Sequence, residues 1–78
     1  MHEESLLKKR LQTIQTEQKL DELHHFKNQS EWSLLAEGDL ELLANLFIKK
    51  GTVDAPKKRD EAVEDFHTAL KITNFHPQ

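Results

Sequence analysis

Hydrophobic residues between positions 32 and 51 recur every three or four positions, which is the period of an α-helix. One row consists of Trp32, Ala36, Leu40, Leu43 and Phe47, and a second row beside it consists of Leu35, Leu42 and Leu46. A stripe this wide is typical of a helix that is buried on more than one side. The pattern therefore predicts a central helix over residues 31–50, on which the other segments pack.

Local signals favour an end of this helix near residue 51. Lys49 and Lys50 complement the carbonyl end of a helix dipole, and Gly51 can adopt the left-handed conformation that closes a helix. Gly38 is the weak point, because an interior glycine costs about 1 kcal/mol relative to alanine. We expect one helix that bends at Gly38. The alternative is a helix that runs through Glu37 and ends in a hairpin turn at Gly38.

Residues 3–27 contain no glycine or proline and predict a long N-terminal helix. Its apolar pattern changes phase, so that two sets of residues would lie on nearly opposite faces of a straight helix. The first set is Leu7, Leu11 and Ile14, and the second is Leu20, Leu23 and Phe26. Residues 15–19 between them are wholly polar. We favour a continuous helix with a different contact on each half, and a break near residues 15–19 is the alternative.

A third amphipathic segment predicts a C-terminal helix over residues 56–73, preceded by a linker over residues 52–56. Pro56 would stand in the first turn, where proline is tolerated. The apolar stripe consists of Ala62, Val63, Phe66, Ala69, Leu70 and Thr73. Residues 75–78 are expected to form a tail, with the alternative that Phe75 folds back onto the core. The predicted core comprises Leu35, Leu40, Leu43, Leu46, Phe47, Val63, Phe66 and Leu70.

These elements predict a single all-α domain over residues 1–78, a small bundle of three main helices. The long N-terminal helix, residues 1–27, would precede a helical hairpin over residues 28–78. A chain of 78 residues seldom draws more than about 3–5 kcal/mol from one core, and the absence of cysteine excludes a disulfide staple. We therefore expect self-association, in the simplest case as a dimer. The predicted contact surface is Leu7, Leu11, Ile14 and Trp32.

Composition narrows the range of partners. The formal net charge of −3 gives no reason to expect general affinity for nucleic acid or anionic lipid. No apolar run approaches the roughly 20 residues that a membrane-spanning helix requires. Residues 1–4 are acidic and lack the basic-then-apolar order of a signal peptide. We expect a cytoplasmic protein without a membrane partner.

The sequence lacks the parts of common enzyme sites. It contains no glycine-rich phosphate loop, no cysteine nucleophile and no pair of histidines at i, i+4 that would bind a metal. We therefore expect no enzymatic activity, no cofactor and no metal. The predicted function is that of a non-enzymatic adaptor, regulator or dedicated chaperone that binds another protein through apolar helix faces.

Residues 24–30 are similar to the phosphorylation motif of histidine phosphotransfer domains. In that family a helical histidine precedes a hydrophobic residue, a lysine and usually a glycine. The resemblance implies that His24 accepts a phosphoryl group and that Lys27 neutralises its charge, while Asn28 stands in place of the glycine. The alternative, which we favour, is that His24 and His25 decorate a helix end, where positive charge is stabilised.

Two further stretches admit a functional interpretation beside a structural one. Residues 61–70 resemble the second helix of a tetratricopeptide repeat, although a single copy cannot form an array and a plain helical hairpin explains the same residues. Lys57, Lys58 and Arg59 could bind a phosphate or nucleic acid at a helix start. We favour a solvated surface for these three cations, because no aromatic or second basic cluster accompanies them.

Overall fold

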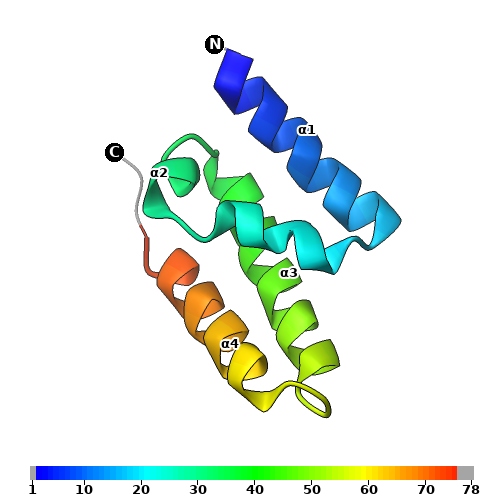
Figure 1. Cartoon of the computed structure of the whole chain (residues 1–78). Coiled ribbons are helices and arrows are strands. Elements are labelled where there is room, and N and C mark those ends of the chain that lie inside the picture. Colours follow the sequence, from blue (N-terminus) through cyan, green and yellow to red (C-terminus); the bar gives the residue numbers. More distant parts are fainter. Residues whose placement is uncertain (1, 76–78) are drawn as a thin grey trace.

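The computed structural model describes the backbone of residues 2–75 and the side chains from Leu6 to Phe75, and all of the secondary structure in this range is helical. The expected tail at residues 76–78 lies outside the described residues. The elements are α1 (His2–Glu17), the 3-10 helix η1 (Leu20–Phe26), α2 (Gln29–Trp32), α3 (Glu37–Asp54) and α4 (Arg59–Thr73) (Figure 1). The predicted all-α fold is confirmed.

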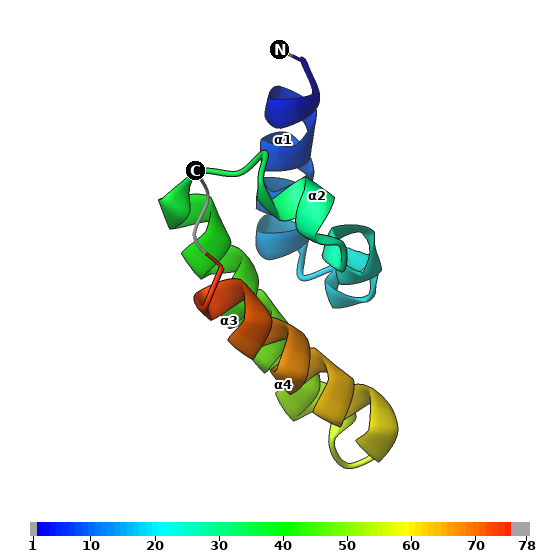
Figure 2. The same ribbon diagram turned by 90° about the vertical axis from the view of Figure 1, so that its left-hand side faces the viewer.

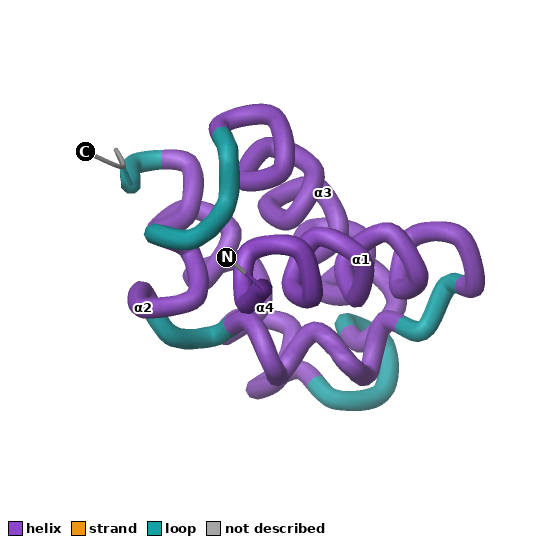
Figure 3. Tube along the Cα trace, turned by 90° about the horizontal axis from the view of Figure 1, so that it is seen from above, coloured by secondary structure: helices purple, strands orange, loops and turns teal. Residues whose placement is uncertain are grey.

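Helices α3 and α4 form an antiparallel hairpin, and the N-terminal elements pack on one side of it. Figures 1 and 2 show α1, η1 and α2 on that side, while no other described element covers the opposite side of the hairpin. Helix α1 packs against both α3 and η1 (Figure 3). The molecule is therefore layered, with one face of the hairpin inside and the other outside.

The core lies between the hairpin and the N-terminal elements. Five of the predicted core residues are buried there, namely Leu35, Leu40, Leu43, Leu46 and Phe47. They are joined by Leu11, Ile14, Leu23, Phe26, Trp32, Ala44, Ala69 and Ile72. The half-buried Phe75 packs on this cluster, with its ring edge-on to Trp32 at 5.7 Å between centroids. The fold-back considered for Phe75 is thus confirmed.

The long continuous N-terminal helix is wrong, and the break considered as the alternative is confirmed. Helix α1 ends at Glu17, and Gln18 adopts a left-handed backbone with φ of 55°. The amide of Lys19 then donates to the carbonyl of Ile14, which is the 6→1 bond of a Schellman ending. The reversal turns both apolar sets toward one core, at a local cost of about 1–2 kcal/mol for a non-glycine residue in this conformation.

The single central helix is also wrong. Helix α2 ends at Trp32, residues 33–36 form a turn, and α3 begins at Glu37 with Gly38 in its first turn. Neither a bend nor a hairpin turn occurs at Gly38. The break frees Trp32 to fold inward, where its buried indole nitrogen donates to the carbonyl of Phe26. A buried indole needs such a partner, and a continuous helix would have pointed Trp32 along the α3 stripe.

The boundary between α3 and α4 is shifted as well. Gly51 does not close α3, because the helix continues to Asp54 and Gly51 has no positive φ. The turn comprises residues 55–58, with Pro56 in the turn and α4 starting at Arg59. The linker predicted over residues 52–56 and the helix start at residue 56 were therefore both too early.

None of the helices within residues 2–75 combines the length and the apolar character needed to cross a lipid bilayer.

Candidate functional site

Helix α4 turns its large apolar residues outward. The side chains of Val63, Phe66 and Leu70 are 59%, 41% and 57% exposed, so their assignment to the core is wrong. They are spaced by three and four positions and form one row along the helix. The buried residues of α4 are instead Ala62, Asp65, Thr68, Ala69 and Ile72. The amphipathic pattern located the helix correctly and the inward face incorrectly.

Small residues and an ion pair explain this orientation. Ala62 and Ala69 are almost fully buried at the inner face of α4, where their short side chains permit close approach to α3. Between them, Asp65 is 1% exposed and accepts hydrogen bonds from Lys50 Nζ, with 3.2 Å to its nearer oxygen. A buried carboxylate requires such a partner. Because Lys50 reaches it only from α3, the ion pair fixes the rotation of α4.

Lys50 bridges two carboxylates, since its Nζ also lies 2.8 Å from Asp54 Oδ2. Burial opposes the charge of Lys50, but the hydrogen bonds to Asp54 and Asp65 outweigh it and raise its pKa. The hydrogen bond from Lys50 lowers the pKa of Asp54. Burial and the neighbouring Asp54 carboxyl raise the pKa of Asp65, against the opposing effect of Lys50. The inner face of α4 therefore buries a carboxylate, at a desolvation cost that an apolar residue at this position would not carry.

Gly51 brings the outer row of α4 against α3. A Cβ atom at Gly51 would lie 2.8 Å from Phe66 Cε1 and 2.9 Å from Phe66 Cζ, closer than side chains tolerate. The ring of Phe66 thus rests on the bare backbone of α3. Ile48, which is 46% exposed, lies one helical turn before Gly51. We call the surface formed by Ile48, Val63, Phe66 and Leu70 the hairpin face.

A groove of about 660 Å³ continues the hairpin face toward the start of α3. Ile48 lines it together with Thr73 of α4 and the exposed carboxylates Glu37 and Glu41. The surface is therefore apolar in its middle and acidic at this end. The signal for this surface in the sequence is the pair of alanines, Ala62 and Ala69, beside the larger Val63, Phe66 and Leu70 on the same helix.

The residues of the predicted contact surface lie in the core and not on the surface. Leu11 and Ile14 are fully buried, Trp32 is 1% exposed, and Leu7 is half-buried against the core. They pack within their own subunit because the chain reversal at Gln18 brings η1 against α1. The prediction that these residues form a protruding interface is wrong.

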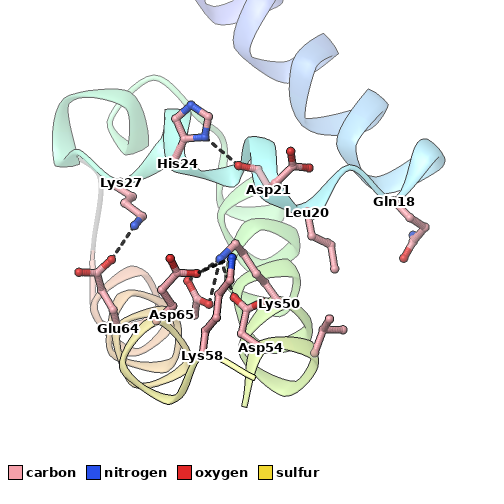
Figure 4. Close-up of a pocket in the computed structure, with 12 residues that line it drawn as sticks. Gln18, Leu20, Asp21, His24, Lys27, Lys50, Asp54, Lys58, Glu64 and Asp65 are labelled. Atoms are coloured by element: carbon pink, nitrogen blue, oxygen red, sulfur yellow. Dashed lines mark hydrogen bonds and ion pairs between the residues drawn. The ribbon is translucent and has the colours of Figure 1, made fainter. Parts of the chain in front are cut away.

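His24 and Lys27 lie at a charged cavity of about 510 Å³ between η1 and the hairpin (Figure 4). The ring of His24 points away from the ion cluster, and its Nδ1 lies 2.7 Å from the carbonyl oxygen of Asp21. Lys27 extends to α4 and binds Glu64 at 2.6 Å, which lowers the pKa of the Glu64 carboxyl. The two residues share a cavity rim, but Lys27 is directed to Glu64 and not to the imidazole.

Lys57, Lys58 and Arg59 are exposed at the end of the turn and the start of α4, at the end of the hairpin opposite the acidic groove. Lys58 lies 3.8 Å from Glu61, so part of this charge is balanced locally. In the described part of the chain, no three His, Asp or Glu side chains lie together in a way that could hold a metal ion.

Comparison with models of known protein families, with curated proteins and with solved structures found no match.

Proposed function

We propose that this protein is a non-enzymatic protein–protein interaction module whose contact surface is the hairpin face. One observation supports the proposal above the others: α4 buries the carboxylate of Asp65 while it leaves Val63, Phe66 and Leu70 in contact with solvent. A buried polar group and a contiguous exposed apolar surface are the informative departures from ordinary burial. A target with an apolar helix surface would complement this face.

Energetics favour an external cover for these residues. Burying a side chain such as Val, Leu or Phe stabilises a protein by about 1.5–3 kcal/mol. A rotation of α4 that buried its outer row would gain this energy, but it would expose Ile72 and separate Asp65 from Lys50. The observed orientation therefore leaves Val63, Phe66 and Leu70 without a cover inside the subunit. A target that covers the hairpin face would bury them without disturbing the core.

A site-specific photo-crosslinker placed at Leu70 in the producing cell tests the proposal. The matched control carries the same crosslinker at Lys71, which is adjacent and exposed but outside the apolar row. We expect a discrete protein adduct from position 70 that disappears when Phe66→Asp is added, and little from position 71. Equal or absent adducts at the two positions would remove the hairpin face as an interface.

A second candidate function rests on the environment of His24. The contact between Nδ1 and the Asp21 carbonyl favours the tautomer in which Nδ1 carries the proton, so Nε2 keeps its lone pair on an exposed ring. Such a nitrogen could accept a phosphoryl group, as the resemblance to phosphotransfer domains implies. Incubation with a small phosphodonor should then produce acid-labile phosphohistidine in the wild type and none in His24→Gln. A wild type without the label ends this alternative.

A further inference from the structure

We infer that the hairpin face binds a second copy of this chain, in an antiparallel arrangement about a two-fold axis. This inference rests on the proposed function, because it names the occupant of the same surface. It is carried by the distribution of charge around the apolar residues. A two-fold interface must be self-complementary, so each end of the surface has to match the opposite end of its copy.

The two ends of the hairpin face carry opposite charge. On α4, Arg59 precedes Val63, Phe66 and Leu70 in a single row with spacings of four, three and four positions. On α3, Glu41 precedes Ile48 and Gly51 by two and nearly three helical turns, and it lines the groove that Ile48 shares. Arg59 and Glu41 are both exposed. Helices α3 and α4 are antiparallel (Figure 1), so the start of α3, with Glu41, and the start of α4, with Arg59, lie at opposite ends of the hairpin.

The distances along the helices match an antiparallel pairing. Gly51 and Phe66 are abreast, since the ring of Phe66 lies on the Gly51 backbone. At 1.5 Å per residue, Arg59 lies about 10 Å from this level along α4, and Glu41 lies about 15 Å from it in the opposite direction along α3. The midpoint between them falls about 2 Å from the level of Phe66, within the apolar residues. A two-fold axis there, perpendicular to the helices, brings Arg59 on α4 of one copy to the same level as Glu41 on the neighbouring α3 of the other, where the two long side chains can meet.

The chemistry of this interface divides into an apolar centre and charged ends. Val63, Phe66, Leu70 and Ile48 of one copy would exclude water against the same four residues of the other. Two symmetry-related ion pairs between Arg59 and Glu41 would fix the direction in which the hairpins meet. Charged groups at an interface rim contribute more to specificity and orientation than to affinity, and a parallel arrangement would place like charges together.

Charge reversal in the full-length chain tests the arrangement. Arg59→Glu leaves a chain with acidic groups at both ends, and Glu41→Arg leaves one with basic groups at both ends. Sedimentation equilibrium should give twice the 9.1 kDa chain mass for the wild type. Each single variant should self-associate at least tenfold more weakly. An equimolar mixture of the two should regain the dimer, because both ion pairs re-form between unlike chains, and so should the chain that carries both changes.

The apolar centre has its own matched pair of variants. Leu70→Glu should abolish the dimer, whereas Leu6→Glu, at a residue 63% exposed on α1, should leave it intact. Far-UV circular dichroism of every variant verifies the fold, which exposed substitutions of this kind seldom disturb. A wild type that sediments at 9.1 kDa up to millimolar concentration overturns the inference. A dimer that survives Leu70→Glu, or single charge variants that dimerise normally without each other, also overturn it.

Failure of this inference and failure of the proposed function are distinguishable. A monomeric wild type whose Leu70 crosslinks specifically to a different protein contradicts the second copy and leaves the hairpin face as an interface. A monomeric wild type without any specific adduct from Leu70 contradicts both.

Discussion

Two rows of large apolar residues run along helices at opposite ends of this chain, and they differ in burial. Leu7, Leu11 and Ile14 on α1 point into the core, whereas Val63, Phe66 and Leu70 on α4 point into solvent. Their spacing is nearly the same. The difference in burial depends on the residues that each helix carries on its other faces.

Helix α1 has a single row of large apolar residues, so only one of its faces is suited to burial against the remainder of the chain. Helix α4 has two inward candidates: the large row, and a face of small residues that includes Ala62, Asp65 and Ala69. Close approach of the alanines to α3 and the Lys50–Asp65 ion pair select the second. Amphipathicity therefore identifies the apolar faces of a helix. Steric fit and charge pairing decide which of these faces is buried inside the subunit.

The largest contrast should come from truncating one residue in each row. Leu11→Ala removes a fully buried side chain and should cost about 2–5 kcal/mol, most of the stability of a chain this small. Leu70→Ala should change subunit stability by no more than about 0.5 kcal/mol. Urea unfolding followed by circular dichroism, at concentrations low enough to suppress self-association, measures both.

Equal costs at the two positions would break the comparison, because they would mean that Leu70 is buried in the isolated subunit or that Leu11 is not. Leu11→Asp sharpens the same point. A buried charge there should prevent folding, whereas an interface residue would yield a folded monomer.

A glycine pair should give an intermediate effect. Gly38→Ala meets no atom within 4 Å and should stabilise α3 by up to about 1 kcal/mol through helix propensity. Gly51→Ala gains the same propensity but displaces the ring of Phe66, so its net effect should be smaller and self-association should weaken. In a Phe66→Ala background the gain from Gly51→Ala should return. A gain that is the same in both backgrounds would show that Phe66 does not rest on Gly51.

Much of the fold could be predicted from the sequence because it depends on periodicity. The helical class, the position of α4 to within three residues at its start, and the burial of Leu40, Leu43 and Phe47 all follow from spacing. The break after α1 could not be predicted, because glutamine is an unusual residue for the left-handed position that Gln18 occupies. Its cost is offset by the burial of Leu23 and Phe26 in the same core as Leu11 and Ile14, a tertiary effect that local backbone preference does not reveal.

The candidate site was missed for a related reason. A sequence shows that Val63, Phe66 and Leu70 share a face, but the side of α4 that meets α3 depends on where Lys50 stands. The sequence pattern predicts a helix end at Gly51, since glycine after a run of lysines commonly closes a helix. Its actual role, contact with Phe66, becomes visible only when two segments 15 residues apart lie side by side.

The smallest expected effect concerns the pH dependence of two neighbouring carboxylates on α4. Burial raises the pKa of Asp65, so the ionised form of Asp65 destabilises the folded state. The free energy of unfolding therefore falls as pH rises above 3.8, the ordinary pKa of an aspartate. The Lys27 hydrogen bond lowers the pKa of Glu64, so its contribution is present above pH 4.5 and is lost as pH falls through the lowered value.

The cost of Asp65→Asn should therefore be smaller at pH 7 than at pH 3, and the cost of Glu64→Gln should show the reverse trend. Unfolding curves recorded across this range provide the measurement. A cost of Asp65→Asn that rises with pH, as expected for Glu64→Gln, would mean that folding lowers the pKa of Asp65 instead of raising it.

The central claim is that the row on α4, and not the row on α1, is the surface available to a partner. Paramagnetic relaxation of methyl signals by a soluble gadolinium chelate tests it most directly. In dilute protein we predict strong relaxation at Val63 and Leu70 and protection at Leu11 and Ile14, with Val63 and Leu70 becoming protected as the concentration rises. Protection of Leu70 in dilute protein, or relaxation of Leu11 equal to that of Leu70, would contradict the claim.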